Sequence, residues 1–418
     1  MPTHYPVIKL VQGNTMIETE IKFKTLTPIW TGDADRKCTT IKDTSIIGSM
    51  RWWYEAIIRG TGDYACDPSN GGCEFDTKGY EKALKDGKSV DEAVEIGLKS
   101  VCPVCRLFGC TGWRRRFRIE VEDICPVELN FVTVENLDKW LKKTLSSRIT
   151  GFYSKKSKMK LISEDELAKK KVLLLIKFME SEASLGAKSQ NGFGIFELVS
   201  SVEVTNELRL NSELFNYIFV KVKLKCEDSD CLLTSFAVKN ILRNRLKQLQ
   251  ECYLDTENIV QILENFQEVD SYRTKMRDLY MDQINEKKRE LQKYKRGSNK
   301  YQKIEKEILK THGEALKYNK TSKILSRALF GSDLLSTRWR SRIEISHVYK
   351  KEDEYYFRVI CHFSEIVDYY DKNNNLNEGK IQLKIDKLKL MEILINFIKD
   401  LPSSLPEIKS IEIFGDQT

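Results

Sequence analysis

Hydrophobic and polar residues alternate along several short stretches of the chain, the pattern of strands with one buried face. The first is residues 17–26, IETEIKFKTL, which a Thr-Pro pair ends. After a loop, residues 44–60, TSIIGSMRWWYEAIIRG, place apolar side chains at helical spacing and finish on a glycine stop signal. The first predicted elements are therefore a strand, a long loop and an amphipathic helix.

Residues 61–113 are irregular and rich in Gly and Cys, with one helix expected at about 88–101. Two further strands are predicted at residues 114–124 and 172–180, and a glycine-rich turn leads into another strand. This alternation predicts an α+β domain over residues 1–210 that carries a Cys-rich insertion at about 61–113.

A second unit is predicted over residues 211–418. A strand at 215–226 is followed by an amphipathic helix at 234–249, and the later predicted strands are RIEISHVY, YYFRVICHF and IEIFG. Residues 273–310 hold 13 basic and six acidic residues and favour a helical insertion at about 271–325. A solvated hairpin, a protein-binding surface and an RNA-binding surface are all open for this insertion.

The length and composition of the chain indicate a folded protein with more than one core. With 418 residues, 41% of them hydrophobic, the chain can bury more than one core, which excludes wholesale disorder. No stretch predicts a transmembrane span and the first residues lack a signal-peptide pattern, so we expect a cytoplasmic protein with no membrane partner. Eleven cysteines in that reducing compartment argue against a disulfide framework.

The cysteines include a candidate metal site. Cys102-Pro-Val-Cys105 has the spacing of a zinc knuckle, and Cys66 and Cys73 form a looser pair upstream, with Cys110 as a competing ligand. Four thiolates would leave no open position on the ion, so any zinc is structural. Buried free thiols are the alternative, and no other cofactor is required.

Two basic runs contain no acidic residue, which indicates contact with phosphates or else a solvated loop. The first run holds Arg106, Arg114, Arg115, Arg116 and Arg118, and the second spans residues 142–160 and includes Lys143, Lys155 and Lys156. The second run also carries two aromatic side chains on which unpaired bases could stack.

The glycine-rich segment 186–194, GAKSQNGFG, allows close approach of a polyanion to the backbone, and Lys188 adds charge; a tight turn before a strand is the simpler interpretation. Trp52 and Trp53 project about 100° apart on their helix, so one of them, with Trp30, is a candidate for a binding surface. Catalytic patterns are scarce, because only four histidines occur and Asp33 and Asp35 are the only loop acids considered for RNA cleavage.

Several segments together resemble a family. TPIWTGDADRK, IKDTSIIGSMRWWYEAIIRG, CPVCRLFGCTGWRRRFRI and LGAKSQNGFGIFEL occur in that order, and they resemble RAMP-superfamily CRISPR proteins, more narrowly subunit one of the type III-B Cmr complex. The resemblance covers most of residues 21–198. It implies two tandem ferredoxin-like (RRM-like) domains that bind guide RNA near its 3′ end and help to capture single-stranded target RNA for antiviral defence, beside other Cmr subunits.

The resemblance also implies site residues. It assigns phosphate contact to residues of the glycine-rich loop, the RWW helix and the basic strand: Lys188, Arg51, Lys42, Thr44, Arg114, Arg115 and Arg116. Trp30 and Trp52 are the stacking candidates. A non-catalytic RNA-binding subunit is therefore expected; the alternatives are a RAMP-type endoribonuclease that uses Asp33 or Asp35, and a scaffold that touches only proteins.

Overall fold

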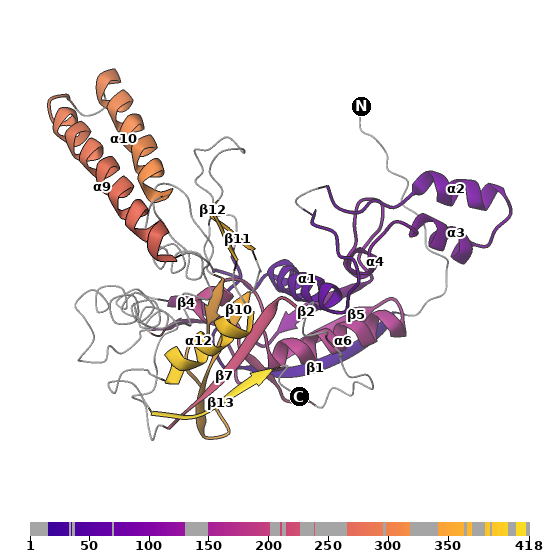
Figure 1. Cartoon of the computed structure of the whole chain (residues 1–418). Helices are drawn as coiled ribbons and strands as arrows, with labels where there is room; N and C mark the ends of the chain where they lie inside the picture. The colour runs from indigo at the N-terminus through magenta and orange to yellow at the C-terminus, as the bar shows by residue number, and fades with distance from the viewer. Residues whose placement is uncertain are drawn as a thin grey trace. The chain divides into compact units, whose positions relative to one another are not determined.

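The computed structural model describes residues 16–32, 35, 38–68, 71–129, 149–200, 210, 215–225, 238, 266–295, 298–317, 342–362, 366–369, 381–384, 387–399 and 407–414. The chain divides into two compact units (Figure 1). The first comprises Met1–Phe131 and Ser146–Asn216, and the second comprises Val132–Leu145 and Tyr217–Thr418. Each unit is mixed α and β and is built on an antiparallel sheet.

A four-stranded sheet forms the core of the first unit. Its strands, in sheet order, are β2 (Phe117–Glu122), β5 (Ser157–Ser163), β1 (Ile17–Thr25) and β6 (Phe196–Leu198). Ile21 lies opposite Met159, and Ile119 lies opposite Leu161. All four side chains are buried, because every second residue of a strand faces the same side.

Two helices cover the buried face of this sheet. Helix α1 (Asp43–Gly60) contacts β2, helix α6 (Glu166–Ser181) contacts β5 and β6, and the two helices contact each other. Along the chain, the strands of this sheet and its two helices occur in the order β1, α1, β2, β5, α6, β6. The strand predicted at 17–26 and the helix predicted at 44–60 are both confirmed.

The strand predicted at residues 172–180 is wrong, because this segment lies inside α6. The buried residues of this segment recur at helical spacing: Val172, Leu175, Ile176 and Met179. The spacing is not evident in the sequence, because these residues belong to a continuous apolar run. Asp165 caps the helix by accepting a hydrogen bond of 2.7 Å from the Ala168 backbone N–H. The polar turn before the apolar run is thus part of the same helix.

The Cys-rich insertion folds around short helices. They are α2 (Thr77–Lys85), α3 (Val90–Gly97) and α4 (Pro103–Phe108). Helix α3 confirms the one helix predicted here, at 88–101, while α2 and α4 were not predicted. Phe75 is buried and its ring stacks on Trp113 with centroids 5.5 Å apart. The other described elements of this unit are a separate antiparallel pair of strands, β3 (Cys125–Leu129) and β4 (Ile149–Tyr153), and the short helix η2 (Ser189–Asn191).

The second unit repeats the strand order of the first. Its sheet runs β13 (Glu407–Phe414), β7 (Tyr217–Lys225), β10 (Glu354–His362) and β8 (Ile343–Ile345), with β9 (Tyr349–Lys351) paired to β10. When the four main strands of each unit are numbered along the chain, both sheets read 4-1-3-2. The strands predicted at 215–226, YYFRVICHF and IEIFG are confirmed as β7, β10 and β13, whereas RIEISHVY is strand only over β8 and at Tyr349, where β9 begins.

Beside this sheet, the second unit contains the helix α12 (Lys387–Lys399) and the strand pair of β11 (Ile366–Tyr369) and β12 (Ile381–Lys384). The helix predicted at 234–249 lies outside the described residues except for Val238, which is helical and buried.

The basic polar stretch forms two helices, α9 (Phe266–Leu291) and α10 (Asn299–Lys317), which pack as a hairpin (Figure 1). Ile284, Ile304 and Ile308 form its small buried core. Within the described part of the chain, no helix is both long enough and apolar enough to cross a bilayer.

Candidate nucleic-acid interface and four-cysteine cluster

The glycine-rich loop is bound to the loop that follows β1. The Ala187 N–H donates to the carbonyl of Trp30 at 2.8 Å, and the Gly194 N–H donates to the carbonyl of Pro28 at 2.9 Å. The hydroxyl of Thr27 accepts from the Ile195 N–H at 2.9 Å. Two segments that are distant in sequence therefore form one backbone-bonded unit.

The structure explains why position 186 of this loop is a glycine. It has φ of +82°, and a Cβ added there would lie 2.7 Å from the carbonyl oxygen of Trp30. Both the positive φ and the close approach exclude a larger side chain. The glycine is therefore needed for loop packing, whatever the loop binds.

Lys188 and Trp30, both selected from the sequence, are brought together. Lys188 has left-handed backbone geometry with φ of 59°, and its ammonium nitrogen lies 3.8 Å from the centre of the Trp30 ring. Trp30 is 9% exposed, while the lysine side chain is exposed above it. Partial burial lowers the pKa of Lys188 from its ordinary value. The tryptophan therefore supports the lysine rather than offering an open stacking surface.

The start of α1 adjoins the same loop. The hydroxyl of Ser49 accepts from the Gly186 N–H at 2.9 Å, and the Lys42 N–H donates to the Thr31 hydroxyl at 3.1 Å. Thr44 is exposed in the first turn of the helix. Ser49 carries no sequence signal of this role, because its partner is far away along the chain.

The adjacent tryptophans of α1 point to different environments. Trp53 is 3% exposed and packs against Phe178, whereas Trp52 is 44% exposed. This split agrees with the expectation that one member of the pair lies at the surface.

The arginines just before β2 are paired with acids from a distant segment of the chain, which no local sequence pattern reveals. Arg114 lies 2.8 Å and Arg116 2.9 Å from the carboxylate oxygens of Glu164, and Arg116 also lies 2.8 Å from Asp165. The Arg115 Nε donates to the carbonyl of Phe117 at 2.7 Å. The positive charge of this basic run, which contains no acidic residue, is thus partly neutralised by Glu164 and Asp165 at the start of α6.

Lys155 and Lys156 are exposed in the turn between β4 and β5. The preceding residue, Ser154, accepts a hydrogen bond of 2.9 Å from the Thr25 N–H, which places this turn at the end of β1 where the Trp30 loop begins. Lys143 and Asp33 lie outside the described residues, and Asp35 is exposed in a turn.

Arg51 points into the insertion. Its guanidinium lies 3.0 Å from Glu55, and it donates to the carbonyl of Gly109 at 3.1 Å and to the sulfur of Cys105 at 3.2 Å. Hydrogen bonding to Glu55 and the nearby Cys105 outweigh burial and raise the pKa of Arg51 above its ordinary value. Glu55 stands four residues after Arg51, a spacing that sequence alone could have flagged.

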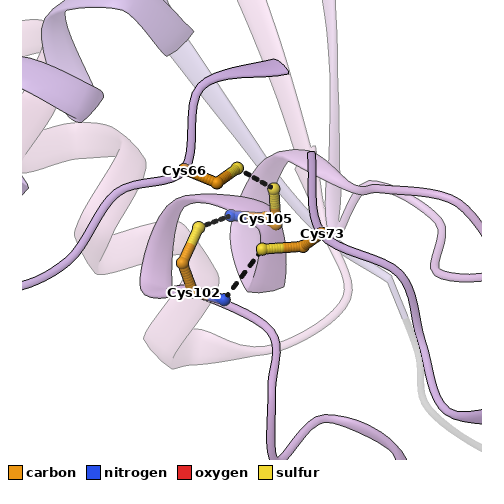
Figure 2. Close-up of side chains that lie close together, drawn as sticks. All are labelled: Cys66, Cys73, Cys102 and Cys105. Atoms are coloured by element: carbon orange, nitrogen blue, oxygen red, sulfur yellow. Dashed lines mark hydrogen bonds between the residues drawn. The ribbon is translucent and has the colours of Figure 1, made fainter. Parts of the chain in front are cut away.

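Four of the predicted cysteines converge (Figure 2). The sulfurs of Cys66, Cys73, Cys102 and Cys105 all lie within 4.8 Å of one another, and Cys66 and Cys105 are 3.4 Å apart. A tetrahedral zinc ion with Zn–S bonds of about 2.3 Å requires sulfurs about 3.8 Å apart. The cluster therefore has the donor set and dimensions for such an ion. Cys110, the competing ligand, is not part of it.

Backbone N–H groups face two of the sulfurs and favour a thiolate at Cys102, whereas burial raises the pKa of the Cys73 and Cys105 thiols. The Cys102 N–H donates to the sulfur of Cys73 at 3.4 Å, and the Cys105 N–H donates to the sulfur of Cys102 at 3.5 Å (Figure 2). Burial opposes ionisation of Cys102, but the N–H groups of Cys66 and Cys105 lower the pKa of this thiol to about 7. Cys102 also begins α4, so the Cys-Pro-Val-Cys motif both starts a helix and supplies two sulfurs.

Comparison with known proteins gives one family match. Residues 22–197 match the RAMP superfamily. The superfamily part of the sequence resemblance is confirmed. No curated protein matches the chain.

Solved structures that are similar to the chain include two of low sequence identity. Apo Cmr1 from Pyrococcus furiosus is 16% identical over 95% of this chain and 98% of its own, with a TM-score of 0.33. A chain of the type III-B Cmr-β complex bound to cognate target RNA is 14% identical over 44% of this chain and 59% of its own, with a TM-score of 0.23.

Proposed function

We propose that the chain is a non-catalytic, RNA-binding subunit of a type III-B CRISPR Cmr effector complex. It binds guide RNA near its 3′ end, helps to capture single-stranded target RNA and contacts other Cmr subunits. The observation that carries the proposal is Lys188, held above Trp30 on a glycine-rich loop that is bonded to α1. The match of residues 22–197 to the RAMP superfamily and the RWW and CPVC motifs support it.

The architecture supports a tandem arrangement. The first unit has the order βαββαβ with a 4-1-3-2 sheet, which is the ferredoxin-like pattern, and the second unit has the same strand order. We assign residues 1–210 and 211–418 to two ferredoxin-like domains, the first with the Cys-rich insertion and the second with the α9–α10 insertion. Such folds bind RNA on several surfaces, so the site rests on its residues and not on the fold.

Among the predicted contacts, the exposed ones are the best phosphate ligands. Lys188, Lys155, Lys156 and Thr44 are exposed, and Trp52 offers the accessible ring for stacking a base. Arg114 and Arg116 reach phosphate only in competition with Glu164 and Asp165. Exposed lysines add affinity through counterion release and lose it at high salt.

The proposed absence of catalysis rests on the residue types near the loop. RNA cleavage needs a group positioned to move a proton, and Asp35 is exposed in a turn. The endoribonuclease alternative would use Asp33 or Asp35. An Asp33→Asn, Asp35→Asn double variant decides between them: cleavage by the native chain that the variant loses supports the nuclease.

We further propose that the four-cysteine cluster holds a structural zinc ion, because an S₄ donor set of this size suits zinc. The ion would hold the segments of the insertion together. It would take no part in a reaction of RNA, because four thiolates fill its coordination sphere. No further cofactor is proposed.

The deciding experiment is a gel shift of the purified chain with labelled single-stranded RNA across a salt series, with a denaturing gel in parallel. The proposal predicts intact RNA and salt-sensitive binding, with log K falling by about 0.7 per phosphate neutralised for each tenfold rise in salt. Specific cleavage products would favour the nuclease. No binding at low salt would favour a scaffold that touches only proteins.

A further inference from the structure

All three described donors of Arg51 have partners, two of them in the insertion and one on α1. One terminal nitrogen donates to the Cys105 sulfur and the other to the Gly109 carbonyl, at 3.2 Å and 3.1 Å, while Nε donates to Glu55 at 3.0 Å. The side chain is 24% exposed. Binding a phosphate would require Arg51 to release these partners.

A zinc ion with four thiolates carries a net charge of about −2, and burial of that charge is unfavourable unless donors surround the sulfurs. Cys66, Cys102 and Cys105 are each at most 4% exposed. Backbone N–H groups face the sulfurs of Cys73 and Cys102. Among the described residues, Arg51 is the one full positive charge with a hydrogen bond to a cluster sulfur.

We propose that Arg51 is an outer-sphere residue of the metal–thiolate centre, and that it couples metal loading to α1 and to the glycine-rich loop. The inference rests on the zinc proposal and deepens it. Arg51, Glu55 and Ser49 all lie on α1, and the Ser49 hydroxyl accepts from the Gly186 N–H at 2.9 Å. The bonds from Cys105 to Arg51, along α1, and from Ser49 to Gly186 thus form a continuous connection from the metal site to the loop that carries Lys188.

This inference changes the role expected of Arg51. It is a positioning residue for the metal centre rather than a direct phosphate contact. Loss of its hydrogen bond to the sulfur weakens metal binding by about 10- to 100-fold, the range typical of outer-shell partners. Loss of the metal in turn loosens α1 and the Gly186 amide.

The test uses the full chain purified without added chelator. Metal content is measured by mass spectrometry, and zinc affinity is measured by competition with a chromophoric chelator, for the native chain, Arg51→Met, Arg51→Lys and the control Arg118→Met. Arg118 is exposed on β2. The inference predicts weaker zinc binding in Arg51→Met, intermediate binding in Arg51→Lys and native binding in Arg118→Met.

Equal zinc affinity in the native chain and both Arg51 variants would overturn the inference. A native chain without zinc, or with a Cys66–Cys105 disulfide in its place, would overturn the zinc proposal and this inference together, while RNA binding in the gel shift would leave the proposed function intact.

Hydrogen exchange of the native chain gives a second readout that needs no variant. Chelation is expected to reduce protection of the Gly186 amide and of α1 while the second unit stays unchanged. Unchanged protection of Gly186 after verified loss of the metal would overturn the coupling between the metal site and the loop.

Discussion

The ammonium group of Lys188 lies 3.8 Å above the centre of the Trp30 ring, and the backbone of the adjacent Ala187 is bonded to that of Trp30. The ring, itself largely buried, limits the directions that the lysine can take. A cation fixed in this way loses less conformational entropy on binding a phosphate than a freely moving lysine does. The pair therefore suits a role in RNA binding that neither residue would perform as well alone.

Replacement of Lys188 should alter the salt dependence of RNA binding more than it alters the fold. Lys188→Met keeps an unbranched apolar side chain over Trp30 but removes the charge, so the slope of log K against log salt should fall in magnitude by about 0.7 if one phosphate contact is lost. Lys188→Arg should retain the native slope. A gel-shift salt series on both variants checks this, and an unchanged slope in Lys188→Met would exclude Lys188 as a phosphate contact.

Two glycines of the first unit should respond to alanine in opposite ways. Gly186→Ala forces a side chain into positive φ and against the Trp30 carbonyl, which should destabilise the unit by about 1–3 kcal/mol. Gly48→Ala, within α1 and with no atom within 4 Å of the added Cβ, should stabilise it by about 0.5–1 kcal/mol. Thermal unfolding of both variants measures the difference, and equal melting temperatures would contradict it.

Hydrophobic periodicity was enough to predict elements such as β1, α1 and β7, but not β5 of the first sheet or α12. The failure at α6 has a physical cause: Leu173 and Leu175 belong to an unbroken apolar run, which looks the same whether it is a buried strand or a helix with a wide buried face. The capping residue Asp165 distinguishes the two, because an N-cap accepts a hydrogen bond from a free N–H group at the start of a helix and not of a strand.

The residues of the candidate site could be predicted from the sequence, but the partners that they contact could not. Cysteine spacing was sufficient to select the four residues that converge, since Cys102 and Cys105 are close in sequence. The partners of Arg116 come from another element, with Asp165 49 positions away, and no local pattern reveals such a pair. Arg51 was selected for its charge, whereas its contacts with Cys105 and Gly109 are set by the tertiary fold.

The neighbouring tryptophans of α1 provide a matched pair of substitutions. Trp53→Ala should destabilise the first unit by about 3–5 kcal/mol, because the side chain is 3% exposed and packs against Phe178. Trp52→Ala should leave stability nearly unchanged. If Trp52 stacks on a base, its loss should weaken RNA binding by about 1–3 kcal/mol.

Denaturation and gel shifts on the two variants separate these roles. Native RNA affinity in Trp52→Ala, with the fold intact, would remove Trp52 from the interface. A stable Trp53→Ala variant would contradict the assignment of that residue to the core.

The second unit should lose stability in mild acid because of His347. Burial lowers the pKa of this imidazole from 6.5 to about 4. Below pH 6.5 the unfolded chain therefore binds a proton that the folded unit does not, and the free energy of unfolding falls as pH drops towards 4. The contribution is fully present above pH 6.5, and its loss amounts to about 3 kcal/mol at most.

The measurement compares urea denaturation of the native chain and His347→Met at pH 7.5 and pH 5. Carboxylates titrate in both proteins, so the difference between the two pH dependences isolates the histidine. The native chain should lose more stability than the variant over this interval, since the variant has no imidazole to protonate on unfolding. Parallel pH dependences would show that His347 is as easily protonated in the folded unit as in the unfolded chain, against its burial beside the β8–β10 sheet.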